Sequence, residues 1–266
     1  IPGLMEYNHS KIQVLDVPGI VEGAATGRGR GKEVLACAQS ADLVIILLDV
    51  FHPEHLEVVK REIFETGLRI NQKPPQVKIS KKARGGIDIG TTVKLTKINK
   101  ETIMGILKEF RLENSSIVVR EDINDDQLID VIEGNKKYIP AITVLNMIDM
   151  VSAKELERIK SITKPDICIS AEKRINTEEL KGLIFKKLDF IRIFCKEAGK
   201  KADVDVPLIM RRENTLRDVC MKLHKDFISK FRFARVWGKS VKFDSMIIRN
   251  LDHKLEDKDI VEIHLS

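Results

Sequence analysis

Unbroken apolar runs alternate with helix-like segments along the first part of the chain. KIQVLDVPG is a short apolar strand that ends in Asp-x-Pro-Gly, and ADLVIILLDV is an apolar run of the kind that is buried on both faces of a parallel sheet. GKEVLACAQSA, which lies between them, has apolar residues at helical spacing, so the pattern predicts a β-α-β unit. YIPAITVLNMID and PDICISAEK predict two further strands of the same sheet.

Polar residues stand where each of these four predicted strands ends. They are Asp16, Asp49, Asn146 with Asp149, and Ser170. Because the carboxyl ends of the strands line the ligand crevice of a doubly wound sheet, we expect these side chains at one common edge.

A long gap separates the second and third predicted strands. Two β-α steps need about 60 residues at roughly 30 per unit, and Asn146 lies much further than that from Asp16. We therefore expect an inserted α+β domain over residues 69–136. Its expected strands are QVKISKKARGG, TTVKLTKI and SSIVVRE, and its expected helices are ETIMGILKEF and DDQLIDVIEG.

The last part of the chain predicts a separate small domain. A capped helix over residues 176–194 closes the α/β domain, and a strand, a capped helix and two strands then fit a ubiquitin-like β-grasp domain at residues 190–266. The predicted fold class is α/β, with a nucleotide-binding domain from residues 1–68 and 137–189, the inserted α+β domain and the β-grasp domain.

Composition narrows the partners and the compartment. The net charge of +6 and the pI of about 9.0 suit an acidic partner such as RNA, and a generally Lys-rich surface explains them equally well. The four cysteines are far apart and form no C-x-x-C pair, so they indicate reduced thiols and neither zinc nor disulfides. No apolar run approaches the roughly 20 residues of a membrane span.

The sequence Asp16-Val17-Pro18-Gly19 predicts contact with a phosphate and its metal ion. A carboxylate at a strand end can hold Mg²⁺, and the N–H of a glycine can approach a terminal phosphate because no Cβ is in the way. The glycine-rich stretch that follows is not a Walker A loop. That pattern needs Gly and a hydroxyl residue where Thr26 and Glu33 stand.

Asn146 and Asp149 have the chemistry that a guanine edge needs. An amide can pair with the Hoogsteen side of the ring, and a carboxylate accepts from N1–H and the exocyclic N2–H₂, a donor pair that adenine lacks. A backbone N–H at Ser170-Ala171 could reach the guanine carbonyl oxygen. The alternative is that Asn146 and Asp149 only cap a helix.

The ordered set DVPGIVEGAATGRGRG, NMID and ISAEK, followed by ARVWGKSVKFD, resembles the DRG family of GTPases in the wider Obg group of translation-associated G proteins. The resemblance implies a P-loop-type GTPase domain, the insertion and a C-terminal TGS domain. Asp16 would be the metal-side residue, Gly19 the γ-phosphate sensor and residues 23–31 the flexible switch. The nucleotide-binding residues implied are Asp16, Val17, Pro18, Gly19, Asn146, Met147, Asp149, Ser170 and Ala171.

The same resemblance implies GTP and GDP as ligands, Mg²⁺ as cofactor and K⁺ as an activator. It implies RNA or the ribosome and a DRG-family regulatory protein as partners, a cytoplasmic location, and neither DNA nor membrane binding. No catalytic residue is assigned. Ile20 stands where many GTPases have a water-orienting Gln, so hydrolysis should be slow.

The chain departs from the family pattern in two respects. Met147 replaces the usual Lys of the guanine motif, which puts nucleotide affinity in question. No Walker A loop and no switch I threonine are found, so we expect a longer gene product and poor GTP binding by this segment alone. The alternatives are a pseudo-GTPase scaffold that binds RNA or protein, and, less favoured, a β-grasp module of an aminoacyl-tRNA synthetase.

Overall fold

The computed structural model describes residues 2–17, 40–203 and 205–266 of the 266-residue chain. The chain divides into two compact units, one drawn from residues 1–18, 45–53 and 142–266 and the other from residues 19–44 and 54–141. The expected helix GKEVLACAQSA lies almost entirely outside the described residues.

The α/β part of the first unit has a three-stranded sheet in the order β10-β9-β3. Its strands are β3 (Val44–Asp49), β9 (Ala141–Asn146) and β10 (Ile167–Cys168), and its helices are α5 (Ala153–Thr163) and α6 (Thr177–Lys187). The apolar residues of β9 are buried on both faces of the strand, as its sequence predicts. The same prediction for β3 is wrong, because Ile46 and Leu48 are buried and Leu47 is exposed.

The first two strands form a hairpin of their own. β1 (Pro2–Tyr7) pairs antiparallel with β2 (Ser10–Leu15), and β2 is not hydrogen-bonded to the three-stranded sheet in the described structure. The expectation that β2 and β3 belong to one sheet is therefore wrong for the described residues, where the two strands lie in separate sheets.

The helix expected over residues 176–194 is shorter than its apolar pattern suggests. α6 ends at Lys187, and Asp189 has a left-handed backbone conformation with φ of 52°. The chain then forms the strand β11 (Phe190–Cys195), in which Ile191 and Ile193 alternate into a core. The apolar residues of this short segment fit both the helical period of 3.6 and the strand period of 2. The sequence pattern therefore extended the predicted helix into the strand.

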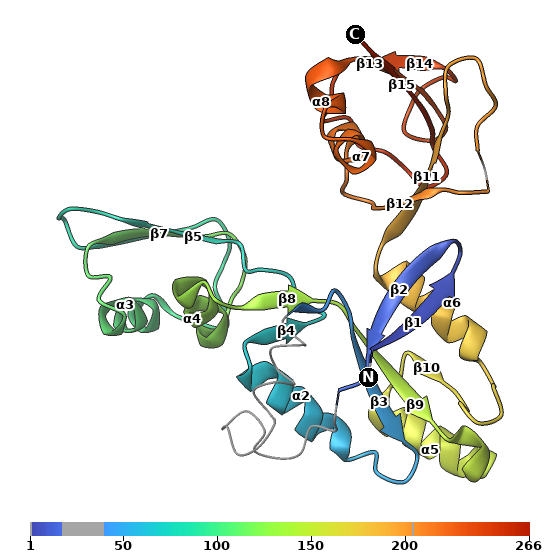
Figure 1. Ribbon diagram of the computed structural model, residues 1–266. Helices are drawn as coiled ribbons and strands as arrows, with labels where there is room; N and C mark the ends of the chain where they lie inside the picture. Colours follow the sequence, from blue (N-terminus) through green and yellow to red (C-terminus); the bar gives the residue numbers. More distant parts are fainter. Residues whose placement is uncertain (1, 18–39, 204) are drawn as a thin grey trace. The chain divides into compact units, whose positions relative to one another are not determined.

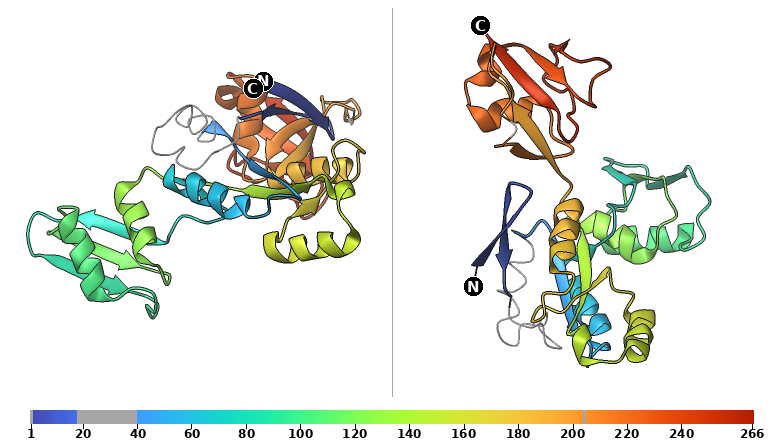
Figure 2. Two further views of the ribbon diagram at one scale, coloured as in Figure 1. Left: turned by 90° about the horizontal axis from the view of Figure 1, so that it is seen from below. Right: turned by 90° about the vertical axis from the view of Figure 1, so that its right-hand side faces the viewer.

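The β-grasp domain is confirmed at the C-terminal end. Its further strands are β12 (Leu208–Arg211), β13 (Phe231–Trp237), β14 (Met246–Ile248) and β15 (Ile260–Leu265), in the sheet order β12-β11-β15-β13-β14. Its helices are α7 (Leu216–Leu223) and α8 (Phe227–Lys230). Figure 2 shows both helices on the same side of this sheet, where α7 packs Leu216 and Val219 against Ala234 and Val236.

The second unit has α2 (His55–Glu65) and a parallel pair of strands, β4 (Leu68–Ile70) and β8 (Lys137–Ile139). Between β4 and β8 lies a small α+β domain whose sheet has the order β5-β7-β6. Its elements are β5 (Val77–Lys81), β6 (Ile87–Thr91), α3 (Lys100–Glu109), β7 (Ser115–Val119) and α4 (Asp125–Glu133). Its core includes Ile103, Leu107, Ile117 and Leu128, and both helices lie on one side of the sheet (Figure 1).

One expected strand of this domain is placed incorrectly by the sequence. The strand β6 ends at Thr91, and most of TTVKLTKI is irregular. The carboxylate of Asp122 accepts hydrogen bonds from the Thr96 N–H at 2.8 Å and from the Thr96 hydroxyl at 2.5 Å. This side chain occupies the backbone donor that a strand would use in a ladder.

None of the helices in the described ranges has both the length and the hydropathy that crossing a membrane requires.

Candidate functional site

Two neighbouring strand ends bring the expected guanine-binding residues together. Asn146 is the last residue of β9, and Asp149 lies in the short 3₁₀ helix η1 (Ile148–Met150) directly after it. Ser170 and Ala171 follow β10, which pairs in parallel with β9. Because neighbouring parallel strands end at the same edge of a sheet, the two motifs lie side by side.

A hydrogen bond from one loop to the other fixes this arrangement. The Ala171 N–H donates to Asn146 Oδ1 at 3.1 Å, and the Ile148 N–H donates to the Ile169 carbonyl at 3.3 Å. The amide NH₂ of Asn146 is a second functional group on the same side chain. Asn146 therefore orders the site through its carbonyl and has donors that a ring acceptor could use.

The helix-capping explanation of Asn146 and Asp149 is wrong. The next helix, α5, has Ser152 as its N-cap residue, and the Ser152 hydroxyl accepts from the Glu155 N–H at 3.3 Å. No side-chain cap is present on η1. The two residues are thus not needed for the helix that follows them.

Asp149 is held as a buried carboxylate. Its side chain is 8% exposed, and Lys173 Nζ lies 3.2 Å from Asp149 Oδ2. A hydrogen bond from the Ser170 hydroxyl, with the Lys173 ammonium as a further cause, holds the pKa of Asp149 below its usual range, although burial opposes this. The side chain is therefore ionised at neutral pH and accepts hydrogen bonds, as pairing with two guanine donors requires.

Lys173 is a charged neighbour of Asp149 that the sequence analysis did not single out. Met147, which stands where the family has Lys, is exposed and has a left-handed backbone with φ of 65°. The ammonium next to the site is instead supplied from the other loop, by the last residue of ISAEK. A Lys three residues after Ser170 is the signal that was available in the sequence.

The structure does not join the phosphate side to this cluster. Asp16 is exposed and Val17 is half-buried directly after β2, and within the described ranges no hydrogen bond or ion pair connects Asp16 to Asn146 or Asp149. Pro18 and Gly19 lie outside the described residues, as does the glycine-rich stretch after them.

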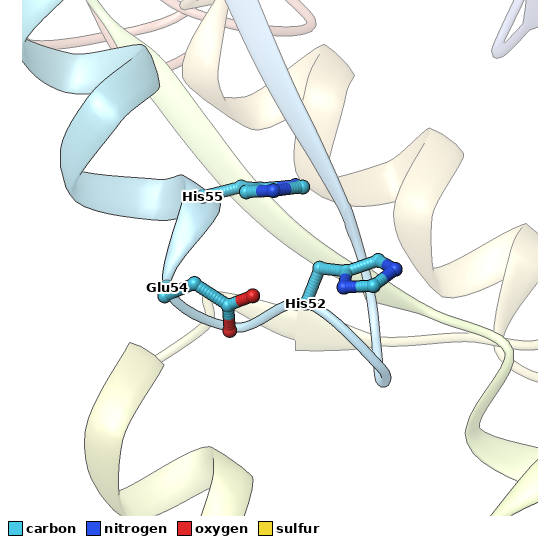
Figure 3. A group of neighbouring side chains, drawn as sticks. All are labelled: His52, Glu54 and His55. Atoms are coloured by element: carbon cyan, nitrogen blue, oxygen red, sulfur yellow. The ribbon is translucent and has the colours of Figure 1, made fainter.

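Asp49, also expected at the common edge, stabilises a turn. Its Oδ1 accepts from the N–H groups of Phe51 at 2.8 Å and His52 at 2.9 Å. His52 and Glu54 lie in the segment that follows, and His55 is the first residue of α2; the ligand-type atoms of all three lie within 4.8 Å of one another (Figure 3). All three residues are exposed, and the sequence analysis did not select them, although two imidazoles and a carboxylate in four residues are a recognisable signal.

Family profiles match almost the whole chain. Residues 1–82 match the 50S ribosome-binding GTPase family (MMR_HSR1), residues 84–190 match the C-terminal region of that domain, and residues 191–265 match the TGS domain.

Relatives match along 99% of the chain. An uncharacterized GTP-binding protein of Methanocaldococcus jannaschii is 49% identical, and the chain spans 68% of that relative's length. Developmentally-regulated GTP-binding protein 1 of Xenopus laevis and ribosome-interacting GTPase 1 of Saccharomyces cerevisiae are each 40% identical, and the chain spans 72% of each.

Proposed function

Because the chain belongs to the family of developmentally regulated GTP-binding proteins, we propose that it binds guanine nucleotides at the ends of β9 and β10. We further propose that it is part of a GTPase of the Obg group that hydrolyses GTP slowly. The observation that carries this proposal is the pairing of Asn146 with Ala171 beside the ionised carboxylate of Asp149. Such a site selects guanine because adenine lacks the N1–H and N2–H₂ donors that the carboxylate of Asp149 would accept from in addition to Ser170 and Lys173.

Each residue of the cluster has a proposed role. Asp149 accepts from N1–H and N2–H₂ of guanine, and Ser170 and Lys173 keep it charged. Asn146 holds the two loops together through its carbonyl, and its NH₂ donates a hydrogen bond to the Hoogsteen side of the guanine ring. The Ala171 N–H already donates to Asn146, so its proposed contact with the guanine carbonyl must share or replace that hydrogen bond.

The phosphate side is proposed from the residues directly after β2. Asp16 is an exposed carboxylate at a strand end, and its oxygens suit a hard divalent cation. When bound, Mg²⁺ neutralises charge on the phosphates of the nucleotide. We assign Asp16 to the metal and Val17, Pro18 and Gly19 to the phosphate-contacting turn, with K⁺ as a proposed activator. Ile20 cannot hold a water by hydrogen bonding, which is why we propose slow hydrolysis.

The proposed role is a GTP-dependent switch in the cytoplasm that acts on the ribosome or its RNA, with a DRG-family regulatory protein as a further partner. The name of the yeast relative, a ribosome-interacting GTPase, supports the ribosomal part of this proposal. We propose residues 1–68 and 137–189 as the GTPase domain, residues 69–136 as the insertion and residues 190–266 as the TGS domain. The alternative, a non-catalytic pseudo-GTPase scaffold that binds RNA or protein through the TGS and insertion domains, is less favoured, since relatives along the whole chain are GTP-binding proteins.

The test is a nuclear magnetic resonance titration of the ¹⁵N-labelled chain with GDP and with ADP, up to millimolar concentrations. GDP should shift the amide signals of Asn146, Asp149 and Ala171, and ADP should not. Asp149→Asn should lose the response to GDP and gain one to xanthosine diphosphate, whose C2 carbonyl accepts from the new amide. Asp244→Asn is the control. Equal shifts with GDP and ADP, or no shifts at all, would overturn the proposal.

Met147→Lys tests the departure from the family pattern. It restores an ammonium beside the nucleotide-binding loop, so we expect a smaller dissociation constant for GDP in the same titration. Met147→Leu retains the apolar side chain and should leave the affinity as it is. An unchanged constant for Met147→Lys would contradict the role given to this position.

A further inference from the structure

The hairpin of β13 and β14 in the TGS domain combines basic and aromatic residues with very little acid. Residues 231–249 include a single acidic residue, Asp244. The basic residues of this segment are Arg232, Arg235, Lys239, Lys242 and Arg249, and its aromatic residues are Phe231, Phe233, Trp237 and Phe243. Alternating charge and π surface in one hairpin is typical of segments that bind nucleic acid.

Some basic residues of the TGS domain outside this hairpin are paired with an acidic residue. Arg192 pairs with Asp257 at 2.7 Å, and Arg217 pairs with Asp252 at 3.0 Å. None of the five basic residues of the hairpin forms an ion pair in the part of the chain that the structure describes. Their charge is therefore not neutralised within the domain and is available to an anionic partner.

The strand register places part of this set on one open face of the sheet. Ala234 and Val236 are fully buried in the core beneath α7, so Phe233, Arg235 and Trp237 project from the opposite face. Arg235 lies opposite Ile247 of β14, which is 49% exposed. Figure 1 shows α7 and α8 on the core side of the sheet.

Contacts across the strands hold the aromatic rings of this face in place. Lys196 Nζ lies 4.6 Å from the centroid of the Trp237 ring, and the rings of Phe233 and His264 stack with centroids 4.3 Å apart. Glu262, opposite Arg235, is buried and hydrogen-bonded to both Lys196 and His264. The acidic residue at the centre of the face is thus covered and paired with two basic side chains, and the outer layer of the face is basic and aromatic.

We propose that this face, together with the loop from Lys239 to Ser245, binds single-stranded RNA. Arg235, Lys239 and Lys242 would neutralise phosphates, and Trp237 and Phe243 would stack on unpaired bases. Phe243 is 64% exposed, which leaves a large apolar ring for a base to cover. A duplex hides the faces of its bases, so the aromatic residues favour a single strand over double-stranded RNA. The choice of RNA over DNA rests on the proposed ribosomal role and not on GTP hydrolysis.

Trp237 is the only Trp of the chain, so its fluorescence reports directly on this face. A fluorescein-labelled 12-nucleotide RNA without secondary structure is titrated with the whole chain at several salt concentrations. Binding should raise the anisotropy and quench Trp237. Phe243→Ala should weaken binding on the order of tenfold. Arg235→Gln with Lys242→Gln should weaken it and lower the salt slope by about 0.7 per lost phosphate contact.

Lys181→Gln removes a basic residue on α6, outside the TGS domain, and should leave both binding and salt slope unchanged. Unaltered thermal unfolding shows that the variants fold. If the RNA binds and the hairpin variants bind as well as the wild type, this surface assignment is wrong and the RNA association stands. If the wild type binds no RNA, the RNA partner is also wrong, whereas the GDP titration is unaffected. Equal binding of duplex RNA or polyglutamate would overturn the choice of a single-stranded ligand.

Discussion

A buried ion pair joins the inserted domain to the strand that precedes it, and its removal gives the sharpest stability prediction. Arg69 of β4 and Asp130 of α4 have side chains that are 5% and 4% exposed, and the guanidinium donates to both carboxylate oxygens at 2.6 Å. Arg69 Nη1 also donates to the Phe64 carbonyl at 2.7 Å, and the guanidinium lies 3.6 Å from the centroid of the Phe64 ring.

Asp130→Asn keeps the shape of the side chain and leaves the charge of Arg69 buried without its counterion. Breaking such a pair costs about 3–5 kcal/mol, because the remaining charge loses its compensation in a site that excludes water. The matched control is Asp88→Asn. It removes a carboxylate that is 71% exposed and whose Oδ2 lies 2.5 Å from Lys82 Nζ. That exposed pair should contribute less than about 1 kcal/mol.

Hydrogen exchange measures the difference where it arises. In Asp130→Asn we expect the core amides of Ile117 and Val119 to exchange about 10²- to 5 × 10³-fold faster, whereas Asp88→Asn should change them little. The urea midpoint from the fluorescence of Trp237, in the β-grasp domain, should not move in either variant. Equal exchange rates in the two variants would refute the reasoning that burial makes this pair critical.

Two other substitutions test the backbone and the site. At Gly238, with φ of 128°, an added Cβ would lie 2.3 Å from Asp259 Oδ1, so Gly238→Ala should lower the free energy of unfolding by more than about 1 kcal/mol, measured by tryptophan fluorescence in urea. Gly105→Ala is the control, because it adds a methyl group to open space in the helix α3 and should be neutral or stabilising; hydrogen exchange of the Ile117 amide measures it, since Trp237 does not report on the inserted domain. Ser170→Ala should raise the pKa of Asp149, since the Ser170 hydroxyl is the first cause of its lowering. In the wild type, Asp149 contributes stability above its unfolded pKa, and this stability is lost as the pH falls through the folded pKa. The free energy of unfolding of Ser170→Ala should therefore fall less at acid pH than that of the wild type. Carboxyl ¹³C titration measures the pKa of Asp149, and unfolding at several pH values measures the stability.

The sequence identified most elements whose pattern had only one interpretation. The run AITVLN forms a strand buried on both faces, and DDQLIDVIE forms a helix. The helix begins with a capping box in which Asn124 accepts from the Gln127 N–H at 2.9 Å and Gln127 accepts from the Asn124 N–H at 3.1 Å. Local chemistry of this kind acts within a few residues, and so a single sequence is enough to predict it.

The errors arise where distant contacts decide the structure. Residues 190–195 have apolar side chains that suit a helix or a strand, and pairing with β12 and β15 makes them a strand. In the site, Asn146, Asp149 and Ala171 were predicted because their types and spacing carry the chemistry. Lys173 was missed because its distance to Asp149 depends on how two loops meet, which spacing along the chain does not reveal.

The net charge of +6 has two equally good explanations from the sequence, an acidic partner or a generally Lys-rich surface. In the TGS domain, the positions of the ion pairs favour an acidic partner. On α6 the half-buried Lys181 pairs with Glu178 at 2.7 Å, one helical turn away, so its charge already has a partner within the helix. In the β13–β14 hairpin, the acidic residue opposite Arg235 is Glu262 of β15, and its carboxylate is already hydrogen-bonded to Lys196 and His264. Basic residues therefore have different consequences in the two elements, and the basic residues of the hairpin, which form no ion pair within the described ranges, lie in the same segment as the exposed Phe243.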